Sequence, residues 1–335
     1  MTVRDAFRNQ ASHCAALGSP FMARLMTLAA DRLQPGTPVT DRIFSWPGDA
    51  SANADNVPLR LGGALHALRL QGKALAEVYP PGTPDDDRLW GEIESAMSEH
   101  GNTILGWLDN PPQTNEVRRA AVILPALAVL HDAFGLPVEL LELGTSGGLN
   151  LRADLFRLNL PDVSIGPSDA QVVLSPEWRG GTPPTKLPPI MRRAGVDLSP
   201  LDPAKPGDRL RLLAYLWADQ PERLTRTRAA IEIARTTPAE ISAGDAGEWL
   251  ECELASPAKD RLRVVLHTVA WQYFPSETRV RAEAAMRSAI GPLARISMEY
   301  DGGIGAGVTL TTWPDGVSKQ IARADFHGRW VEWMV

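Results

Sequence analysis

The residues best suited to chemistry lie between Val138 and Leu151, where the chain reads VELLELGTSGGLNL. A short apolar run bounded by glycines predicts a buried strand followed by a sharp turn. The glycines let the backbone bend and leave no side chains in the way of a ligand. A helix that begins directly afterwards directs its unbonded N–H groups toward the same space. The stretch therefore predicts a ligand site at the carboxyl end of a strand.

The elements that must position this site fall into two parts. Residues 1–114 carry apolar side chains at helical spacing, such as Leu61, Leu65 and Leu68, and show no convincing strand pattern. The polar, proline-bearing stretch at 110–116 predicts a boundary. We therefore expect a helical N-terminal domain over 1–114 that caps an α/β domain over 115–335. A proline- and glycine-rich insertion is expected at about 157–190.

Strand and helix patterns alternate after residue 138. Apolar runs at 261–274 and 294–301 predict further strands, and the segment between them has helical spacing. The stretch GVTLTTWPDGVSKQIAR at 307–323 predicts an antiparallel hairpin around a Pro-Asp-Gly turn. Alternation of this kind is typical of a mostly parallel sheet with helices on both faces.

Composition excludes several classes of protein. The formal net charge of −6 argues against a sequence-independent nucleic-acid binder, which needs a basic surface. Cys14 and Cys252 have neither disulfide nor metal-site spacing, so no metal ion is expected. The longest apolar stretch, 120–130, is too short to span a bilayer. We expect a cytoplasmic protein without a membrane partner.

The full pattern of the turn is Glu142-x-Gly144-x-Ser146-x-Gly148. It resembles the first motif of class I S-adenosylmethionine-dependent methyltransferases, where an acid-x-Gly-x-Gly-x-Gly turn lies against the methionine half of the cofactor. Ser146 stands where that family has its middle glycine. The resemblance implies S-adenosylmethionine as cofactor. It also implies a doubly wound, mostly parallel, seven-stranded Rossmann-like sheet with a C-terminal antiparallel hairpin.

The same resemblance implies a set of site residues. The acid that binds the ribose hydroxyls corresponds to Asp197, with Asp162 as the alternative nearer in sequence, and the adenine contact corresponds to Asp245. The catalytic candidates are His267 and Tyr273, near the end of the strand that faces the transferred methyl group. Capping or turn roles for the two acids and a structural role for the histidine are the open alternatives. The implied cofactor contacts are Glu142, Gly144, Thr145, Ser146, Gly148, Asn150, Asp197 and Asp245.

The same turn also spells Gly-x-Ser-x-Gly, the nucleophile elbow of α/β-hydrolases. Acids and histidines follow Ser146 in the order of that triad, either as Asp245 and His267 or as Asp301 and His327. Two features weaken this alternative. Only helical sequence precedes the turn, whereas an elbow normally follows several strands, and no HGGG-type oxyanion loop lies upstream.

A longer series of motifs resembles an uncharacterised bacterial family. It comprises ELGTSGGLNL, EWRGG, GVDLSPLDP, RLRLLAYLWADQ, GDA, HTVAWQY and HGRWVEW. This resemblance covers most of the chain and implies no activity. The leading expectation for function is therefore a fold-level one, a methyltransferase that acts on an unidentified small or medium acceptor. The alternatives are an esterase-like hydrolase using Ser146 and a non-catalytic cofactor-binding protein.

Overall fold

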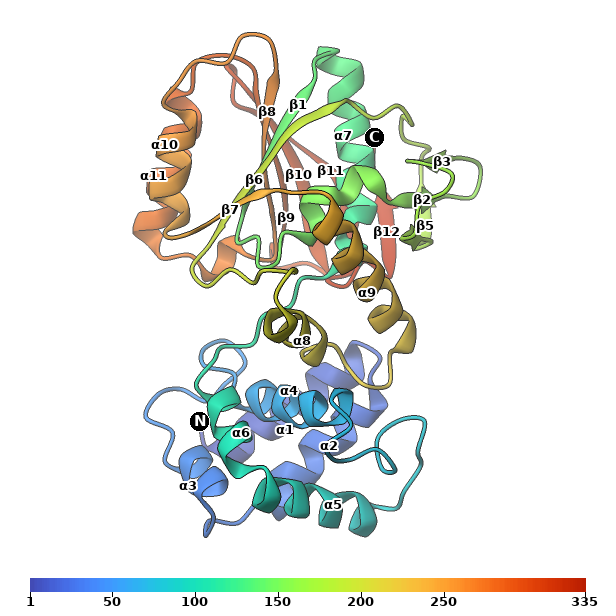
Figure 1. Ribbon diagram of the computed structural model, residues 1–335. Helices are drawn as coiled ribbons and strands as arrows, with labels where there is room; N and C mark the ends of the chain where they lie inside the picture. Colours follow the sequence, from blue (N-terminus) through green and yellow to red (C-terminus); the bar gives the residue numbers. More distant parts are fainter. The chain divides into compact units, whose positions relative to one another are not determined.

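The computed structural model describes residues 1–335 (Figure 1). The chain forms two compact units. Unit 1 comprises Met1–Thr114 and Lys205–Thr225, and unit 2 comprises Asn115–Ala204 and Arg226–Val335. The first stretch of unit 1 ends where the sequence predicts a boundary. The sequence predicts that 205–225 lies in the α/β domain, but this segment belongs to unit 1.

Unit 1 is entirely helical, and its helix starts follow from local capping chemistry. Thr2 and Asp5 form a capping box, and the Asp85 carboxylate accepts a hydrogen bond of 2.8 Å from the backbone N–H of Arg88. The helices are α1 (Val3–Ala16), α2 (Pro20–Arg32), α3 (Pro38–Phe44), α4 (Val57–Leu70), α5 (Asp86–Glu99), α6 (Gly101–Leu108) and α8 (Pro206–Ala214).

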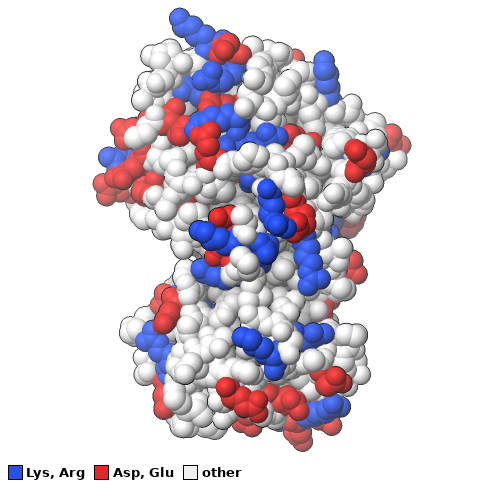
Figure 2. Space-filling view, viewed as in Figure 1, with Lys and Arg blue, Asp and Glu red and all other residues white.

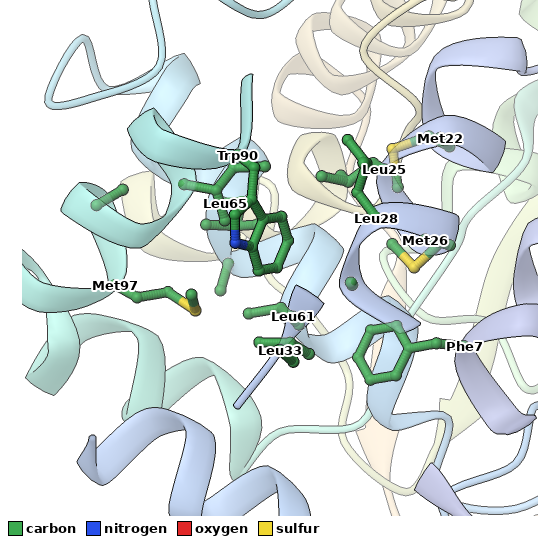
Figure 3. Packing of buried hydrophobic residues seen from close by; sticks show 14 of the residues in the cluster. Phe7, Met22, Leu25, Met26, Leu28, Leu33, Leu61, Leu65, Trp90 and Met97 are labelled. Atoms are coloured by element: carbon green, nitrogen blue, oxygen red, sulfur yellow. The ribbon is translucent and has the colours of Figure 1, made fainter. Parts of the chain in front are cut away.

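Helix α4 is the centre of the core of unit 1. Figure 3 shows its Leu61 and Leu65 among buried side chains that include Phe7 and Trp90. A Cβ atom at Gly63 would lie 2.5 Å from the ring of Tyr215, so the glycine lets the end of α8 pack closely against α4. The buried His66 ring also bonds the carbonyl oxygen of residue 214 at 3.1 Å. These contacts explain why 205–225 belongs to this unit.

Unit 2 is built on a nine-stranded mixed sheet. The strand order is β5 (Glu177–Gly180), β12 (Trp330–Trp333), β11 (Val317–Ala324), β10 (Ala306–Trp313), β9 (Leu293–Glu299), β8 (Leu262–Thr268), β1 (Val138–Leu143), β6 (Ile190–Asp197) and β7 (Glu240–Ala243). The five strands from β9 to β7 are mutually parallel, and β5 is parallel to β12. The pairs β9–β10, β10–β11 and β11–β12 are antiparallel.

The expected seven-stranded methyltransferase sheet is therefore wrong. No helix separates β9 from β10, because a glycine-rich turn at 301–305 sends the chain straight back as an antiparallel neighbour. The short strand β12 extends the sheet beyond the predicted hairpin, and β5 from the predicted insertion pairs with β12. The rest of the insertion forms a separate small sheet in the order β3 (Ser164–Ile165), β2 (Arg157–Asn159), β4 (Val173–Leu174).

Helices cover both faces of the main sheet (Figure 1). Helices α10 (Ala246–Leu254) and α11 (Ser276–Ser288) pack on one face around a core that includes Leu141, Val196 and Val265. Helix α7 (Ala120–Phe134), which follows the short η1 (Val117–Arg119), lies on the other face. The remaining elements are η2 (Leu149–Leu155), α9 (Pro221–Thr236) and η3 (Trp271–Tyr273). Because both faces are covered, every residue of β1 is buried.

The displayed face of the molecule carries charges of both signs (Figure 2). Figure 2 shows Lys and Arg side chains interspersed with Asp and Glu over the displayed face. None of the helices combines the length and the apolar character needed to cross a membrane.

Candidate functional site

The turn after β1 holds its backbone in an unusual conformation. Gly144 and Gly148 have φ values of 70° and 66°, and Ser146 between them has a φ of 51°. The left-handed region is uncommon for a serine and is found disproportionately at functional sites. The next strand of the sheet has a similar feature, because Val269 directly after β8 also has a φ of 51°. Two strained turns therefore lie at the carboxyl ends of two adjacent parallel strands.

Nearly every backbone N–H of the first turn bonds within the protein. The N–H groups of Gly144 and Thr145 both donate to the carbonyl of residue 196 in β6, at 2.9 and 3.1 Å. That of Ser146 donates to the Asp197 carboxylate at 2.9 Å. The N–H of residue 148 donates to the carbonyl of residue 145, and the N–H of residue 149 donates to Asn115 Oδ1, both at 2.8 Å. Only Gly147 keeps an N–H without an acceptor, so the turn is no cradle for a phosphate, which needs several such groups.

The glycines are required by close packing within the protein. A Cβ atom at Gly144 would lie 2.7 Å from the Cβ of Ala270, which follows β8, and one at Gly148 would lie 2.6 Å from Ile241 Cδ1 in β7. The sequence predicts that the glycines leave room for a ligand. In the structure they also let the turn after β1 meet the segments at the ends of its neighbours in the sheet.

Glu142 is buried beneath the turn, with 2% of its surface exposed. Thr145 Oγ1 donates to its carboxyl group at 2.6 Å. Burial raises the pKa of Glu142 to about 8, and the nearby Asp197 charge acts in the same direction. The Thr145 hydrogen bond and the charges of Arg152 and Arg119 oppose this shift without cancelling it. Glu142 is therefore a neutral acid at pH 7.

The other two predicted acids lie at the ends of the adjacent strands. Asp197 ends β6, and its carboxylate also accepts the N–H of Ser199 at 2.9 Å. The alternative ribose acid, Asp162, lies in the turn between β2 and β3 of the small sheet. Asp245 follows β7 as the N-cap of α10, and the N–H of Gly244 donates to the Asp197 carbonyl at 3.0 Å. The structure thus brings Glu142, Asp197 and Asp245 to one edge of the sheet.

Asp245 has several hydrogen-bond partners. Its carboxylate accepts the N–H groups of Gly247 and Glu248 at 2.8 and 3.0 Å, and the hydroxyl of Thr278 in α11. Partial burial acts to raise the pKa of Asp245, but these three donors outweigh it and lower the pKa. The capping role that the sequence left open is therefore present.

The two catalytic candidates have very different surroundings. His267 is fully buried at the end of β8, with Nδ1 2.7 Å from Glu299 Oε1 and Nε2 2.8 Å from Arg295 Nε. Burial and the Arg295 charge lower the pKa of His267, against the effect of Glu299. Tyr273, on η3, has 64% of its surface exposed. His267 is therefore enclosed by the protein, whereas Tyr273 faces solvent.

Glu299, at the end of β9, is not among the residues that the sequence motifs indicate. Its Oε1 accepts bonds from His267 and from the N–H groups of Ala270 and Trp271, at 3.1 and 3.2 Å for the latter two. Burial acts to raise the pKa of Glu299, but these donors outweigh it and lower the pKa. One signal was available in the sequence, because Glu299 lies near the carboxyl end of the strand predicted at 294–301.

The remaining predicted contacts are Asn150 and Ser146. Asn150 donates from Nδ2 to the carbonyl of Glu116 at 3.2 Å, which ties η2 to the segment before η1. The Ser146 hydroxyl oxygen is buried and makes no hydrogen bond, so no histidine activates it as a nucleophile. Asp301, an acid of the alternative triad, pairs with Arg323 at 2.6 Å. No group of three or more His, Cys, Asp or Glu side chains is arranged to hold a metal ion.

Comparison with known proteins gives one match. No curated protein and no solved structure matches the chain. A family model matches residues 4–333, nearly the whole chain, and its description names no activity. The predicted membership of an uncharacterised bacterial family is thereby confirmed, whereas no match supports the resemblance to methyltransferases. The chain belongs to the family described as "Uncharacterized protein conserved in bacteria (DUF2332)".

Proposed function

We propose that the protein binds S-adenosylmethionine at the carboxyl ends of β1, β6, β7 and β8, and transfers its methyl group to a small or medium acceptor in the cytoplasm. One observation carries this proposal. The parallel strands lie in the order β9-β8-β1-β6-β7. From β1 the chain adds β6 and β7 on one side, and it then crosses over to add β8 and β9 on the other side of β1. The glycine turn therefore lies at the switch point, where open α/β sheets bind ligands.

The chemistry of this edge favours a cationic ligand that carries hydroxyl groups. With one unbonded N–H, the turn offers little to a phosphate, and the Asp197 carboxylate beside it repels anions. Carboxylates accept hydrogen bonds from ribose hydroxyls and from an ammonium group. The ring of Phe274 reaches within 3.6 Å of a Cβ position on Gly144, so an aromatic ring lies beside the turn. The face of an aromatic ring stabilises a cation such as a sulfonium ion.

Each residue has a definite part in the proposed site. Asp197 accepts the ribose hydroxyls, and the backbone beside Asp245 contacts the adenine, because the Asp245 carboxylate caps α10. Glu142 acts through Thr145, which it holds in the turn. S-adenosylmethionine supplies an already activated methyl group, so the protein contributes mainly by aligning the acceptor. The exposed Tyr273 contacts the acceptor. His267 has both ring nitrogens hydrogen-bonded and supports η3 by stacking on Trp271.

Calorimetric titration with S-adenosylmethionine and S-adenosylhomocysteine tests the proposal. We expect both to bind the wild-type protein. Asp197→Asn weakens binding by about tenfold, the effect of one charged hydrogen bond. Gly144→Arg abolishes it. Asp162→Asn and Gly91→Arg are the matched controls, since Asp162 lies in the small sheet and a side chain at Gly91 would meet nothing within 4 Å. Absence of binding to the wild-type protein would refute the proposal.

The hydrolase remains the second candidate because of one observation, the strained φ of Ser146. This candidate lacks a general base for Ser146, because the Ser146 hydroxyl has no hydrogen bond and His267 is bonded at both ring nitrogens. Covalent labelling of Ser146 by a fluorophosphonate, absent in Ser146→Ala, would favour the hydrolase. Binding of S-adenosylmethionine without turnover on any acceptor would favour the non-catalytic binding protein.

A further inference from the structure

A partly buried polar cluster lies next to the turn that follows β8. It consists of His267 on β8, Arg295 and Glu299 on β9, and Trp271 on η3. The Trp271 ring stacks on the His267 ring at 4.9 Å between centroids, and the Arg295 guanidinium lies 4.2 Å from the centroid of the Trp271 ring. The proposed mechanism assigns no chemical step to these residues. The hydrogen bonds, the ring stacking and the cation–π contact among them nevertheless indicate that they fix a local conformation.

The hydrogen bonds fix the proton on the His267 ring. Arg295 can only donate, so His267 Nε2 must accept its bond of 2.8 Å and carry no proton. Nδ1 then carries the ring proton and donates it to Glu299 at 2.7 Å. The remaining charged group near Arg295 is Glu283 of α11. A protonated His267 would oppose an N–H to the Arg295 N–H, so the arrangement needs the neutral ring.

Glu299 connects this cluster to the candidate site. One of its oxygens accepts from His267 and from two consecutive backbone N–H groups, those of Ala270 and Trp271. These bonds hold the segment directly after Val269, whose positive φ is costly for a β-branched residue. The Cβ of Ala270 in turn lies 2.7 Å from a Cβ position on Gly144. A continuous set of contacts thus runs from Glu299 to the glycine turn.

We infer that Glu299 is a positioning residue that, with His267 and Arg295, holds residues 269–274 in one conformation and presents Trp271 and Phe274 as a preset wall of the ligand site. This inference rests on the proposed function for the nature of the ligand. The positioning itself is independent of the ligand, because all of the bonds are internal to unit 2. Glu299→Ala leaves the three donors without an acceptor, whereas Glu299→Gln keeps an acceptor oxygen of the same reach.

The test combines a local signal with binding. The protein is labelled with 5-fluorotryptophan, and the ¹⁹F resonance of residue 271 is assigned with Trp271→Phe. We expect Glu299→Ala to shift or broaden this resonance and to weaken S-adenosylmethionine binding by about tenfold. We expect Glu299→Gln to keep both close to the wild-type values. Glu248→Ala, an exposed glutamate of α10, is the matched control. An unchanged resonance in Glu299→Ala would overturn the inference.

Two further measurements keep the outcomes distinct. ¹⁵N spectra of His267 are expected to show one neutral tautomer with the proton on Nδ1, and a proton on Nε2 contradicts the inference. If Glu299→Ala does not fold, Glu299→Asp replaces it, because the shorter side chain withdraws the carboxylate and must shift the residue 271 resonance. If the wild-type protein binds no S-adenosylmethionine, the proposed function fails, while the resonances still decide whether Glu299 positions the turn.

Discussion

Glu142 shows how one residue can match a motif and yet carry a different charge from the one the motif suggests. An acid ahead of a glycine turn suggests an anion that faces the ligand. Here the side chain is buried, and the pKa of about 8 keeps it protonated at neutral pH. The negative charge at this edge of the sheet therefore comes from Asp197 at the end of β6 and from Asp245 after β7.

Glu142→Gln is expected to make the stability less dependent on pH. The folded-state pKa of Glu142 is about 8 and the ordinary value is 4.5, so between these pH values the folded chain holds a proton that the unfolded chain has released. The free energy of unfolding of the wild-type protein therefore falls as pH rises through this range, by on the order of 4 kcal/mol from this group. Glutamine does not ionise and removes this contribution.

Urea unfolding near pH 5 and near pH 8 measures this effect. The free energy of unfolding should fall from pH 5 to pH 8 more in the wild-type protein than in Glu142→Gln. Relative to the wild type, the variant should therefore be more stable at pH 8 than at pH 5. Glu332→Gln, an exposed residue of β12, is the control and should follow the wild type. Equal pH dependence of wild type and Glu142→Gln would contradict the prediction.

The positions of site residues were more predictable than their hydrogen bonds. The resemblance to the methyltransferase motifs points to Glu142, Asp197 and Asp245, and these residues meet because the carboxyl ends of parallel strands lie at one edge of the sheet. Whether each carboxylate is bonded depends on groups far along the chain, such as Thr278 for Asp245. Glu299 was missed for the same reason, since its importance comes from donors about 30 residues earlier, with separations of 28, 29 and 32 residues.

Among the elements, helix α10 depends on a single capping residue. Asp245→Ala removes the acceptor of two N–H groups in the first turn of α10 and of the Thr278 hydroxyl of α11. We expect a loss of about 1–2 kcal/mol in the free energy of unfolding. Asparagine also caps helices, so Asp245→Asn should lose less.

Chemical unfolding together with amide exchange checks this prediction. Exchange at Gly247 and Glu248 should accelerate in Asp245→Ala, because these amides lose their acceptor. Asp260→Ala, at an exposed acid before β8, serves as the control. Equal stability of Asp245→Ala and the control would rule out the capping contribution.

The long apolar strands were predictable, whereas the short strands β5 and β12 were not. The strands β1 and β8 are buried along their whole length, so hydrophobic runs mark them clearly. The strands β5 and β12 have four residues each and carry charged side chains. The only partner of β5 is β12, about 150 residues away, whereas β12 pairs with both β11 and β5. Local sequence contains no information on such a pairing.

At the scale of the whole molecule, unit 1 is completed by a segment from the middle of the chain. Asp219 accepts a hydrogen bond of 2.5 Å from the Ser19 hydroxyl and one of 2.9 Å from the N–H of Phe21. Both donors lie at the start of α2, some 200 residues earlier, so no sequence pattern could have assigned 205–225 to this unit.

Asp219→Ala is expected to destabilise the start of α2. The change leaves two donors at its first turn without their acceptor, which costs about 1–3 kcal/mol. Hydrogen exchange should accelerate at the Phe21 amide more than in the centre of α4. Asp31→Ala, at an exposed acid of α2, is the matched control. Unaltered exchange at Phe21 would contradict the prediction.

The split composition of unit 1 sets an order of events during synthesis. The helices α1 to α6 leave the ribosome first, yet α8 and Asp219 emerge only after β1 and β6 have been made. Until then, the groove on α4 at Gly63 lacks Tyr215, and the Ser19 hydroxyl lacks its acceptor. The nascent helical segment therefore stays incomplete while the first sheet strands emerge. Incompletely folded chains that expose apolar surface tend to aggregate, so we expect chaperones to act on the chain during this interval.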